Sequence, residues 1–389
     1  MDDRYVAKAD IGQFYDSIYT HAVAWALVGQ KLAKATTHTK PEPWYNALDR
    51  LTRFTKRNET TGVTIGPATS TVVGELLLGA VDRELTQFNY TRFVDDYVAY
   101  CKSETEALDF LNTLRYELNK YNLAVNPRKT KIQALPVSTT PKWIRELRRL
   151  TPSRLLASSQ EIEDILDEAI ELIDEDIDTS ALVWALRAAE PSFSSLQPHA
   201  IQKIRARLLH LAARRAPVVP FLCRFYSATN TNPAPDRPAL KSILRAHLGE
   251  GRTDCGLWLT YLLLSHELKL GANLIDELIG RADALTLTVM ATSTSEPARR
   301  AAKAFAIKLT KATVDNYDRD RYWLLLYELH RLGEISVGSY SDPSFDIMKR
   351  EGVTFVDWNR KSLDRSELRL PRLPGPFALF GASGSTSPD

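Results

Sequence analysis

The sequence predicts an α+β domain, built from an antiparallel sheet and helices, followed by an all-α C-terminal region. Runs rich in β-branched and aromatic residues are interspersed with helical patterns only before about residue 135. Beyond about residue 180, apolar residues recur at the spacing of amphipathic helices, up to a Gly/Ser/Pro-rich tail. A chain of 389 residues is longer than one core normally supports, so we expect two or three domains.

The first elements of the α+β part follow from local patterns. Residues 5–11 form an apolar run that predicts a strand entering a turn. Apolar side chains then recur at helical spacing and predict an amphipathic helix, through Trp44, Leu48, Leu51 and Phe54.

Four further elements are predicted in this part, over residues 69–85, 90–94, 97–101 and 131–135. The first is a helix opened by a Gly-Pro turn, the next two form a hairpin around Asp95 and Asp96, and the last is a closing strand. Ser103 and Glu106 form a capping box that begins another helix before that closing strand.

The C-terminal part begins with a reversal of charge. Residues 142–154 carry five basic residues and one acid, and residues 161–178 carry ten acids and no base. An apolar stripe through the acidic stretch predicts a helix with a solvated acidic face. Helix then follows helix, which indicates a HEAT-like solenoid of helical hairpins. We expect a first domain, a helical connector, a helical-repeat domain and a disordered tail, at residues 1–138, 139–180, 181–370 and 371–389.

Composition and charge exclude several classes of protein. Three widely spaced cysteines without a C-x-x-C pair argue against a disulfide framework or a zinc site and fit the cytoplasm. No apolar run reaches the ~18 residues of a membrane span, so we expect no membrane partner. Residues 1–154 carry 22 Lys and Arg against 17 Asp and Glu, whereas the remainder carries 28 against 31. The first part is therefore the better candidate for contact with nucleic acid.

Three carboxylates stand where a metal site could form. Asp10 ends the first predicted strand, and Asp95 and Asp96 occupy the tight turn of the hairpin. If the strands are neighbours in one sheet, Asp10 and Asp95 converge at its edge. Two or three Asp side chains suffice for Mg²⁺, which prefers oxygen ligands and keeps several waters. The alternative is that Asp95 and Asp96 are only a polar hairpin turn and Asp10 only a cap.

Four motifs in a fixed order resemble those of reverse transcriptases. They are DIGQFYDSI at residues 10–18 (motif A), GVTIGPATS at 62–70 (motif B), FVDD at 93–96 (motif C) and NPRKTK at 126–131 (motif D). The string FYDSIYTH at residues 14–21, and Ile65 where most of these enzymes have glutamine, are similar to bacterial antiviral reverse transcriptases of the abortive-infection and defence-associated groups.

The resemblance implies a polymerase palm over residues 1–138 and an RNA-directed DNA polymerase that uses dNTPs. The implied catalytic residues are Asp10, Asp95, Asp96 and Lys129. The three aspartates would hold Mg²⁺ (or Mn²⁺), with Asp96 peripheral, and Lys129 would lie near the leaving pyrophosphate. A solvated surface lysine is the alternative for Lys129.

The implied substrate-binding residues are Ile11, Tyr15, Ile65, Gly66 and Pro67. Tyr15 lies five residues after Asp10, where these enzymes place an aromatic gate against the ribose 2′-hydroxyl. Tyr15 therefore favours deoxynucleotides and disfavours an RNA polymerase. Gly66 and its small neighbours let the backbone approach the nascent base pair, although Gly66-Pro67 is also explained as a plain turn before a helix.

The implied partners are an RNA template, a DNA product, or both. A thumb-type contact with a duplex is expected after motif D, at Lys142, Arg145, Arg148 and Arg149. A second reverse transcriptase, or further copies of this chain, are candidate protein partners, and the resemblance implies a role in defence against phage.

One departure from the family concerns the start of the chain. Only nine residues precede Asp10, where reverse transcriptases have a fingers region that grips the triphosphate. We therefore expect a truncated copy that polymerises poorly by itself. The rival hypothesis is a non-catalytic palm remnant that binds protein or nucleic acid. The three intact aspartates argue against that rival, and the missing fingers argue for it.

Overall fold

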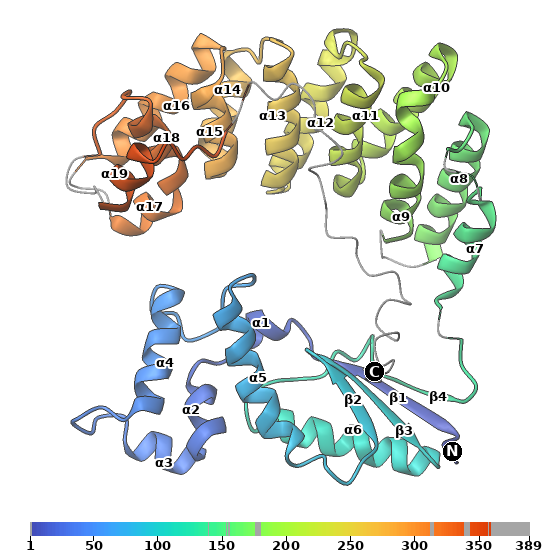
Figure 1. The fold of residues 1–389 in the computed structure, drawn as a ribbon, viewed down its shortest axis with the longest axis vertical. Coiled ribbons are helices and arrows are strands. Elements are labelled where there is room, and N and C mark those ends of the chain that lie inside the picture. The colour runs from blue at the N-terminus through green and yellow to red at the C-terminus, as the bar shows by residue number, and fades with distance from the viewer. Residues whose placement is uncertain are drawn as a thin grey trace, which may run out of the picture. The chain divides into compact units, whose positions relative to one another are not determined.

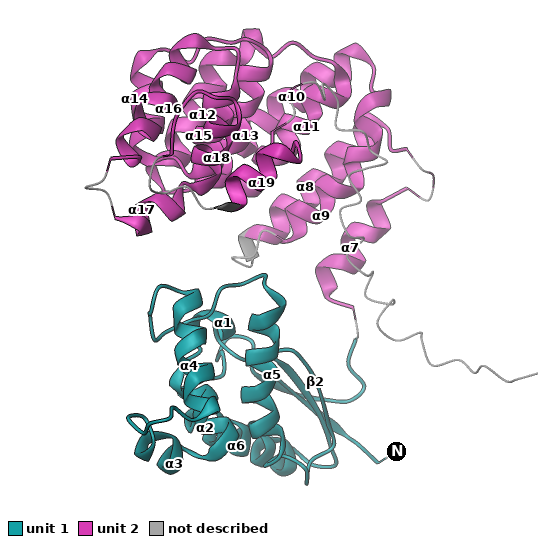
Figure 2. Cartoon of the chain, turned by 60° about the vertical axis from the view of Figure 1, so that its left-hand side comes forward, with its two compact units in different colours: residues 1–139 teal, residues 140–389 magenta. Residues whose placement is uncertain are grey.

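The computed structural model divides the chain into two compact units, residues 1–139 and 140–389 (Figure 2). The residues that the structure describes are 2–138, 140–152, 154, 156–175, 180–311, 315–337, 343–356 and 358. The predicted tail at 371–389 therefore lies outside the described residues. The predicted division of the second unit into a connector and a repeat domain stays a prediction.

A four-stranded antiparallel sheet forms the centre of the first unit. Its strands are β1 (Tyr5–Asp10), β2 (Tyr90–Phe93), β3 (Asp96–Cys101) and β4 (Lys131–Ala134). Their order in the sheet is β2-β3-β1-β4, and every neighbouring pair is antiparallel (Figure 1). The predicted hairpin and closing strand are thus confirmed, and the hairpin strand β3 lies directly beside β1.

Two long helices support the sheet. Helix α6 (Glu104–Asn119) packs against β1, β3 and β4, and also contacts α5 (Ala68–Asp82). The predicted cap of α6 is present, since the Ser103 hydroxyl accepts a hydrogen bond from the Glu106 backbone N–H at 3.1 Å. The Glu106 carboxylate reaches one residue further back than in the usual capping box and accepts from the N–H of Lys102 at 2.7 Å.

Three helices between β1 and the next predicted helix were not predicted. They are α1 (Phe14–Ser17), α2 (His21–Val28) and α3 (Gln30–Ala35). Helix α2 contacts α3, α4 and α5, and half of its residues are buried. Because apolar residues surround α2 instead of forming one stripe, its sequence shows no helical period.

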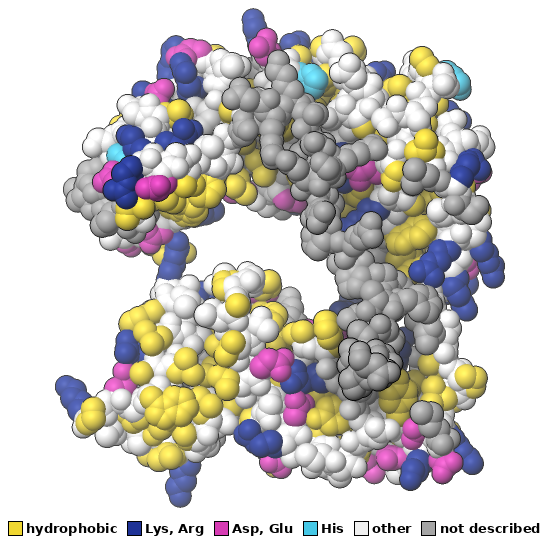
Figure 3. Space-filling view, in the orientation of Figure 1, with side chains coloured by type: hydrophobic (Ala, Val, Ile, Leu, Met, Phe, Trp, Pro, Cys, Tyr) yellow, Lys and Arg dark blue, Asp and Glu magenta, His cyan; other side chains and the backbone are white. Residues whose placement is uncertain are grey.

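Helix α4 (Trp44–Thr55) is present where predicted, but of its predicted apolar stripe only Leu48 packs against the core. Trp44, Leu51 and Phe54 are each more than half exposed, whereas the buried residues of the helix are polar. Figure 3 shows apolar side chains gathered over this part of the first unit. The carboxylate of buried Asp49 in α4 lies 2.5 Å from Nδ1 of His21. The buried side of α4 therefore makes a polar contact where an apolar one was expected.

All regular secondary structure among the described residues of the second unit is helical, and most of its helices form two layers. One layer comprises α8 (Ser159–Glu175), α10 (Pro198–Ala212), α12 (Arg237–Gly249), α14 (Ala272–Arg281) and α16 (Glu296–Leu309). The other layer comprises α9 (Ser180–Ala189), α11 (Val219–Thr229), α13 (Thr253–Ser265), α15 (Ala284–Thr292) and α18 (Trp323–Arg331). The other α-helices among the described residues are α7 (Lys142–Leu150), α17 (Asn316–Arg321) and α19 (Pro343–Arg350). Short 3-10 helices lie at η1 (Glu190–Ser195), η2 (Ala216–Val218) and η3 (Ala234–Asp236).

The acidic helix α8 packs against the core of the second unit on one side and forms ion pairs with α10. Its predicted apolar stripe is confirmed, because Ile162, Ile165 and Leu166 are buried in the core of the second unit. Its acidic side is solvated as expected at Asp164, Asp167 and Glu171, whereas Glu163 is an exception. Glu163 is buried and pairs with Lys203 of α10, and Asp167 pairs with Arg207 of the same helix.

Among the described residues, none of the helices is both long and apolar enough to cross a membrane.

Candidate active site

The strand pairing brings the candidate carboxylates to one edge of the sheet. Asp10, the last residue of β1, stands directly opposite Asp96, the first residue of β3. Residues opposite one another in an antiparallel pair project from the same face, so these two side chains are neighbours. The backbone carbonyl of Asp95 accepts a hydrogen bond from the N–H of Ile11 at 3.2 Å. Asp96, which the motif resemblance made peripheral, is therefore the residue in register with Asp10.

Lys129 adds a positive charge to this edge. Its ammonium lies 3.0 Å from the Asp10 carboxylate, although 119 residues separate the two in the sequence. The turn that carries Lys129 is fixed to β1, because the N–H of Asn126 donates to the Asp10 carbonyl at 2.7 Å. The Asn126 side chain also accepts from the N–H of Arg128 at 3.1 Å, which closes the turn locally. Motif D thus holds Lys129 against motif A.

Negative charge at this site is only partly compensated. Burial, together with the charges of Asp95 and Asp10, raises the pKa of the Asp96 carboxyl above its usual value. The hydrogen bond that Lys129 donates to Asp10, together with the negative charge of Asp10, raises the pKa of Lys129. One ammonium therefore faces three carboxylates, which favours the approach of a further cation.

The donor set fits a hard divalent cation that takes few ligands from the protein. Asp10 is only 8% exposed, and it offers carboxylate oxygens beside Asp96. Within the described part of the chain, no three His, Cys, Asp or Glu side chains are close enough to form a metal-binding group. Mg²⁺ does not require such a cage, because it is commonly held by one or two carboxylates, with substrate phosphates and waters completing its shell.

The hairpin turn between β2 and β3 has a strained backbone. Phe93 pairs with Asp96, so Val94 and Asp95 are the two turn residues. Val94 has φ +54°, a conformation that a β-branched residue rarely adopts. A residue held in this region costs on the order of 1–3 kcal/mol and persists only where its surroundings impose it. The carboxylate of Asp95 follows immediately, so the strain lies at the candidate metal site.

The residues with predicted roles in nucleotide binding lie around α1 and the start of α5. Tyr15 of α1 packs against the Phe14 ring at 5.1 Å, and its carbonyl accepts from the N–H of Val63 at 2.9 Å. Gly66 has φ +117°, which requires glycine, and Pro67 is the N-cap of α5. The structure therefore links motif A to motif B through the backbone at Tyr15.

Two other predicted contact residues differ in exposure. The side chain of Ile65 is 67% exposed beside Gly66 and is free to meet a ligand. Ile11 is 1% exposed and belongs to the core of the first unit, so only its backbone could contact a nucleotide. Its N–H is already committed to the carbonyl of Asp95.

The predicted nucleic-acid contacts lie on α7 of the second unit. Leu147 is buried, while Arg145, Arg148 and Arg149 are exposed. Lys142 is exposed as well, and its Nζ lies 3.6 Å from Oε1 of Glu146. Helix α7 thus has one apolar and one basic side, which suits a contact with phosphates. That role stays a prediction.

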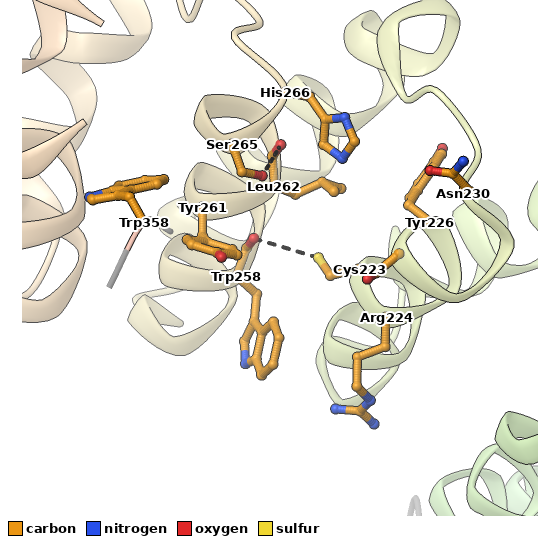
Figure 4. A pocket seen from close by; sticks show the side chains of 11 residues that line it. Cys223, Arg224, Tyr226, Asn230, Trp258, Tyr261, Leu262, Ser265, His266 and Trp358 are labelled. Atoms are coloured by element: carbon orange, nitrogen blue, oxygen red, sulfur yellow. Dashed lines mark hydrogen bonds between the residues drawn. The ribbon is translucent and has the colours of Figure 1, made fainter. Parts of the chain in front are cut away.

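A separate cavity lies in the second unit, between α11 and α13 (Figure 4). Its volume is about 360 Å³, and Tyr226 of α11 and Tyr261 of α13 lie on opposite sides of it. The Trp358 ring stacks on Tyr261 at 5.4 Å, and Arg224 is paired with Glu190. None of the predicted site residues lines this cavity.

The motif reasoning misses one residue at the active-site edge, Arg92. Its side chain is 13% exposed, and its guanidinium contacts Asp82, Glu75 and the carbonyl of Val94. The available signal was its position immediately before motif C. Without the fold, however, an isolated arginine in a strand gives no indication of its partners.

The first unit thus gathers carboxylates and a lysine at one end of an antiparallel sheet, a donor set that suits metal-assisted phosphoryl transfer. Residues 2–159 match the family model described as reverse transcriptase (RNA-dependent DNA polymerase). The match covers the first unit and the start of the second, and it supports a reverse transcriptase domain in this part of the chain. Among curated proteins, none matches the chain significantly.

Proposed function

We propose that the chain is an RNA-directed DNA polymerase of the bacterial antiviral reverse-transcriptase group, which transfers nucleotides from dNTPs with divalent metal. The family match supports the reverse transcriptase domain, and the likeness of motifs A and B to defence-associated enzymes motivates the narrower assignment. The observation that carries the proposal is the pairing of Asp10 with Asp96 across β1 and β3, with Lys129 at 3.0 Å.

In this proposal Asp10, Asp95 and Asp96 hold Mg²⁺ or Mn²⁺. The ions would supply charge stabilisation at the phosphoryl group. Lys129 would neutralise or protonate the leaving pyrophosphate. Tyr15 would lie beneath the sugar and exclude a 2′-hydroxyl, and Gly66 would admit the nascent base pair.

The basic side of α7 would bind nucleic acid. Arg145, Arg148 and Arg149 are exposed there and would contact backbone phosphates of the template or product. The two-layered helices that follow would form a HEAT-like array for a protein or nucleic-acid partner. A role in phage defence rests on the motif resemblance.

The test is incorporation of labelled nucleotides by the full chain on a primed RNA template. We expect dNTP incorporation that EDTA abolishes and that Asp10→Asn reduces at least about a hundredfold, because a metal-binding carboxylate is lost. Asp109→Asn on α6 is the matched control, since Asp109 is exposed and its substitution makes the same change of charge.

Nucleotide selection tests the role of Tyr15. We expect the unmodified chain to prefer dNTPs over NTPs and Tyr15→Val to lose that preference, because the smaller side chain leaves room for the 2′-hydroxyl. Equal use of both nucleotides by the unmodified chain would contradict the gate. Equal activity of the Asp10→Asn and Asp109→Asn variants would contradict the polymerase assignment and favour the non-catalytic alternative.

A further inference from the structure

Arg92, the residue before the last of β2, donates hydrogen bonds from all three of its guanidinium nitrogens. Nε and Nη2 donate to the Asp82 carboxylate at 2.9 and 2.8 Å. Nη1 and Nη2 donate to the Glu75 carboxylate at 2.9 Å each, which makes a second two-pronged contact. Nη1 also donates to the backbone carbonyl of Val94 at 2.9 Å. Arginine is the side chain whose planar fork suits this geometry.

The contacts of Arg92 connect helix α5 with the hairpin turn at Val94. Glu75 and Asp82 both belong to α5, the helix that begins after Gly66 and Pro67. Asp82 is itself fixed, because it accepts from the hydroxyls of Tyr90 and Tyr97 at 3.0 and 3.3 Å. These contacts fix the guanidinium against α5, in the position from which it donates to the hairpin turn.

The contact with Val94 falls on the strained residue of the turn. The positive φ of Val94 is unfavourable for a β-branched side chain, so the turn needs an external constraint. The hydrogen bond from Arg92 constrains the Val94 carbonyl, and the hydrogen bond from the Ile11 N–H constrains the next carbonyl, that of Asp95. The carboxylates of Asp95 and Asp96 follow directly along the chain.

We propose that Arg92 is a positioning residue, which holds the strained Val94-Asp95 turn so that the carboxylates of Asp95 and Asp96 face Asp10. The inference rests on the proposed function, because it gives those carboxylates the task of holding divalent metal. The simpler explanation is that Arg92 only fastens β2 to α5. The two explanations differ in what a glycine at position 94 would do.

The experiment measures Mn²⁺ affinity of the full chain, by electron paramagnetic resonance of the free ion. We expect Arg92→Gln to weaken binding about tenfold, or ~1.4 kcal/mol, because the turn relaxes away from the bound geometry. We expect the double variant Arg92→Gln/Val94→Gly to recover to within about threefold of the unmodified chain. Glycine adopts a positive φ without cost, so the turn no longer needs the arginine.

Arg83→Gln is the matched control. Arg83 also ties the end of α5 to a backbone carbonyl, that of Ala26 at 3.2 Å, but it does not touch the turn. We expect Arg83→Gln to leave the Mn²⁺ affinity unchanged. If Arg92→Gln does not fold, Arg92→Lys replaces it, because one ammonium cannot serve both carboxylates and the Val94 carbonyl. Unchanged affinity in the Arg92 variant, or a loss that Val94→Gly does not recover, overturns the proposal.

A second readout separates this proposal from the proposed function. If the unmodified chain binds no Mn²⁺, the metal site is contradicted, and amide hydrogen exchange without metal then tests Arg92 alone. We expect the amides of residues 92–98 to exchange at least about tenfold faster in Arg92→Gln than in Arg83→Gln, because the turn has lost its constraint. Equal exchange in the two variants overturns the positioning role.

Discussion

At the scale of single residues, the balance of charge around Asp10 decides how the site meets a metal. The Lys129 ammonium already contacts the carboxylate that the proposed ion would use. Lys129 is 64% exposed, so its ion pair with Asp10 is partly screened and is worth about 0.2–1 kcal/mol. A divalent ion must therefore displace a weak competitor, while the same lysine remains available for the pyrophosphate.

Substitution of Lys129 should accordingly have opposite effects on binding and on turnover. We expect Lys129→Met to increase the Mn²⁺ affinity, by at most about fivefold, because the competing ammonium is removed. We expect nucleotidyl transfer to slow by about 10²–10⁴-fold, the range for loss of a general acid. Mn²⁺ titration and single-turnover kinetics measure the two effects, with Lys131→Met of β4 as the control. A Lys129 variant that binds Mn²⁺ more weakly would refute the competition.

At the scale of elements, the contact between α1 and α5 depends on the absence of one side chain. A Cβ added at Gly74 of α5 would lie 3.0 and 3.2 Å from the Phe14 ring and 3.6 Å from the Tyr15 ring. Tyr15 is the proposed gate, so Gly74 allows α5 to approach the residue to which we assign selection of the sugar. Gly79, in the same helix, has no atom within 4 Å of such a Cβ.

Alanine at these two glycines should therefore change stability in opposite directions. We expect Gly74→Ala to lower the free energy of unfolding by about 1–3 kcal/mol, because the added methyl overpacks the interface with Phe14. We expect Gly79→Ala to raise it by up to ~1 kcal/mol, since alanine is the better helix former and meets nothing. Urea denaturation followed by circular dichroism measures both. Stabilisation by Gly74→Ala would mean that α1 moves aside freely.

At the scale of the whole molecule, each unit has its own hydrophobic core. The core of the first unit is made by residues between Ala7 and Leu123, and that of the second by residues between Leu147 and Phe345. The three cysteines are all buried, with Cys101 in the first core and Cys223 and Cys255 in the second. Burial raises the pKa of Cys101 to about 11 and that of Cys255 to about 12, so both thiols stay protonated at pH 8.

The cysteines therefore report separately on the unfolding of the two units. In pulsed alkylation at pH 8 across a urea series, we expect no labelling of the native chain. Cys101 should then become reactive along one transition, and Cys223 and Cys255 together along another. The transition of the larger second unit should be steeper, because the slope scales with the surface exposed on unfolding. Mass spectrometry of the labelled peptides gives one curve for each cysteine. If all three curves coincide, the two units do not unfold independently.

Local sequence determined the elements that have an apolar stripe on one side or are bounded by clear turn and capping residues. The strands around Asp95 and Asp96, the capped helix after Ser103 and the apolar stripe of α8 are all present where the pattern predicts them. The four motifs also predicted the class of domain that the family match supports. These signals depend on neighbours within a few residues, so they can be recognised before any tertiary structure forms.

Tertiary structure alone decided the register and the partners. The pairing that sets Asp96 opposite Asp10 depends on how two distant strands align, and a shift of one residue would turn every side chain to the other face. The same holds for Lys129 and for Arg92, whose partners are far away in the sequence. The exposure of most of the apolar stripe of α4 likewise could not be predicted without knowing that Asp49 contacts His21. Local periodicity records which residues share a side of an element, whereas long-range packing decides what that side meets.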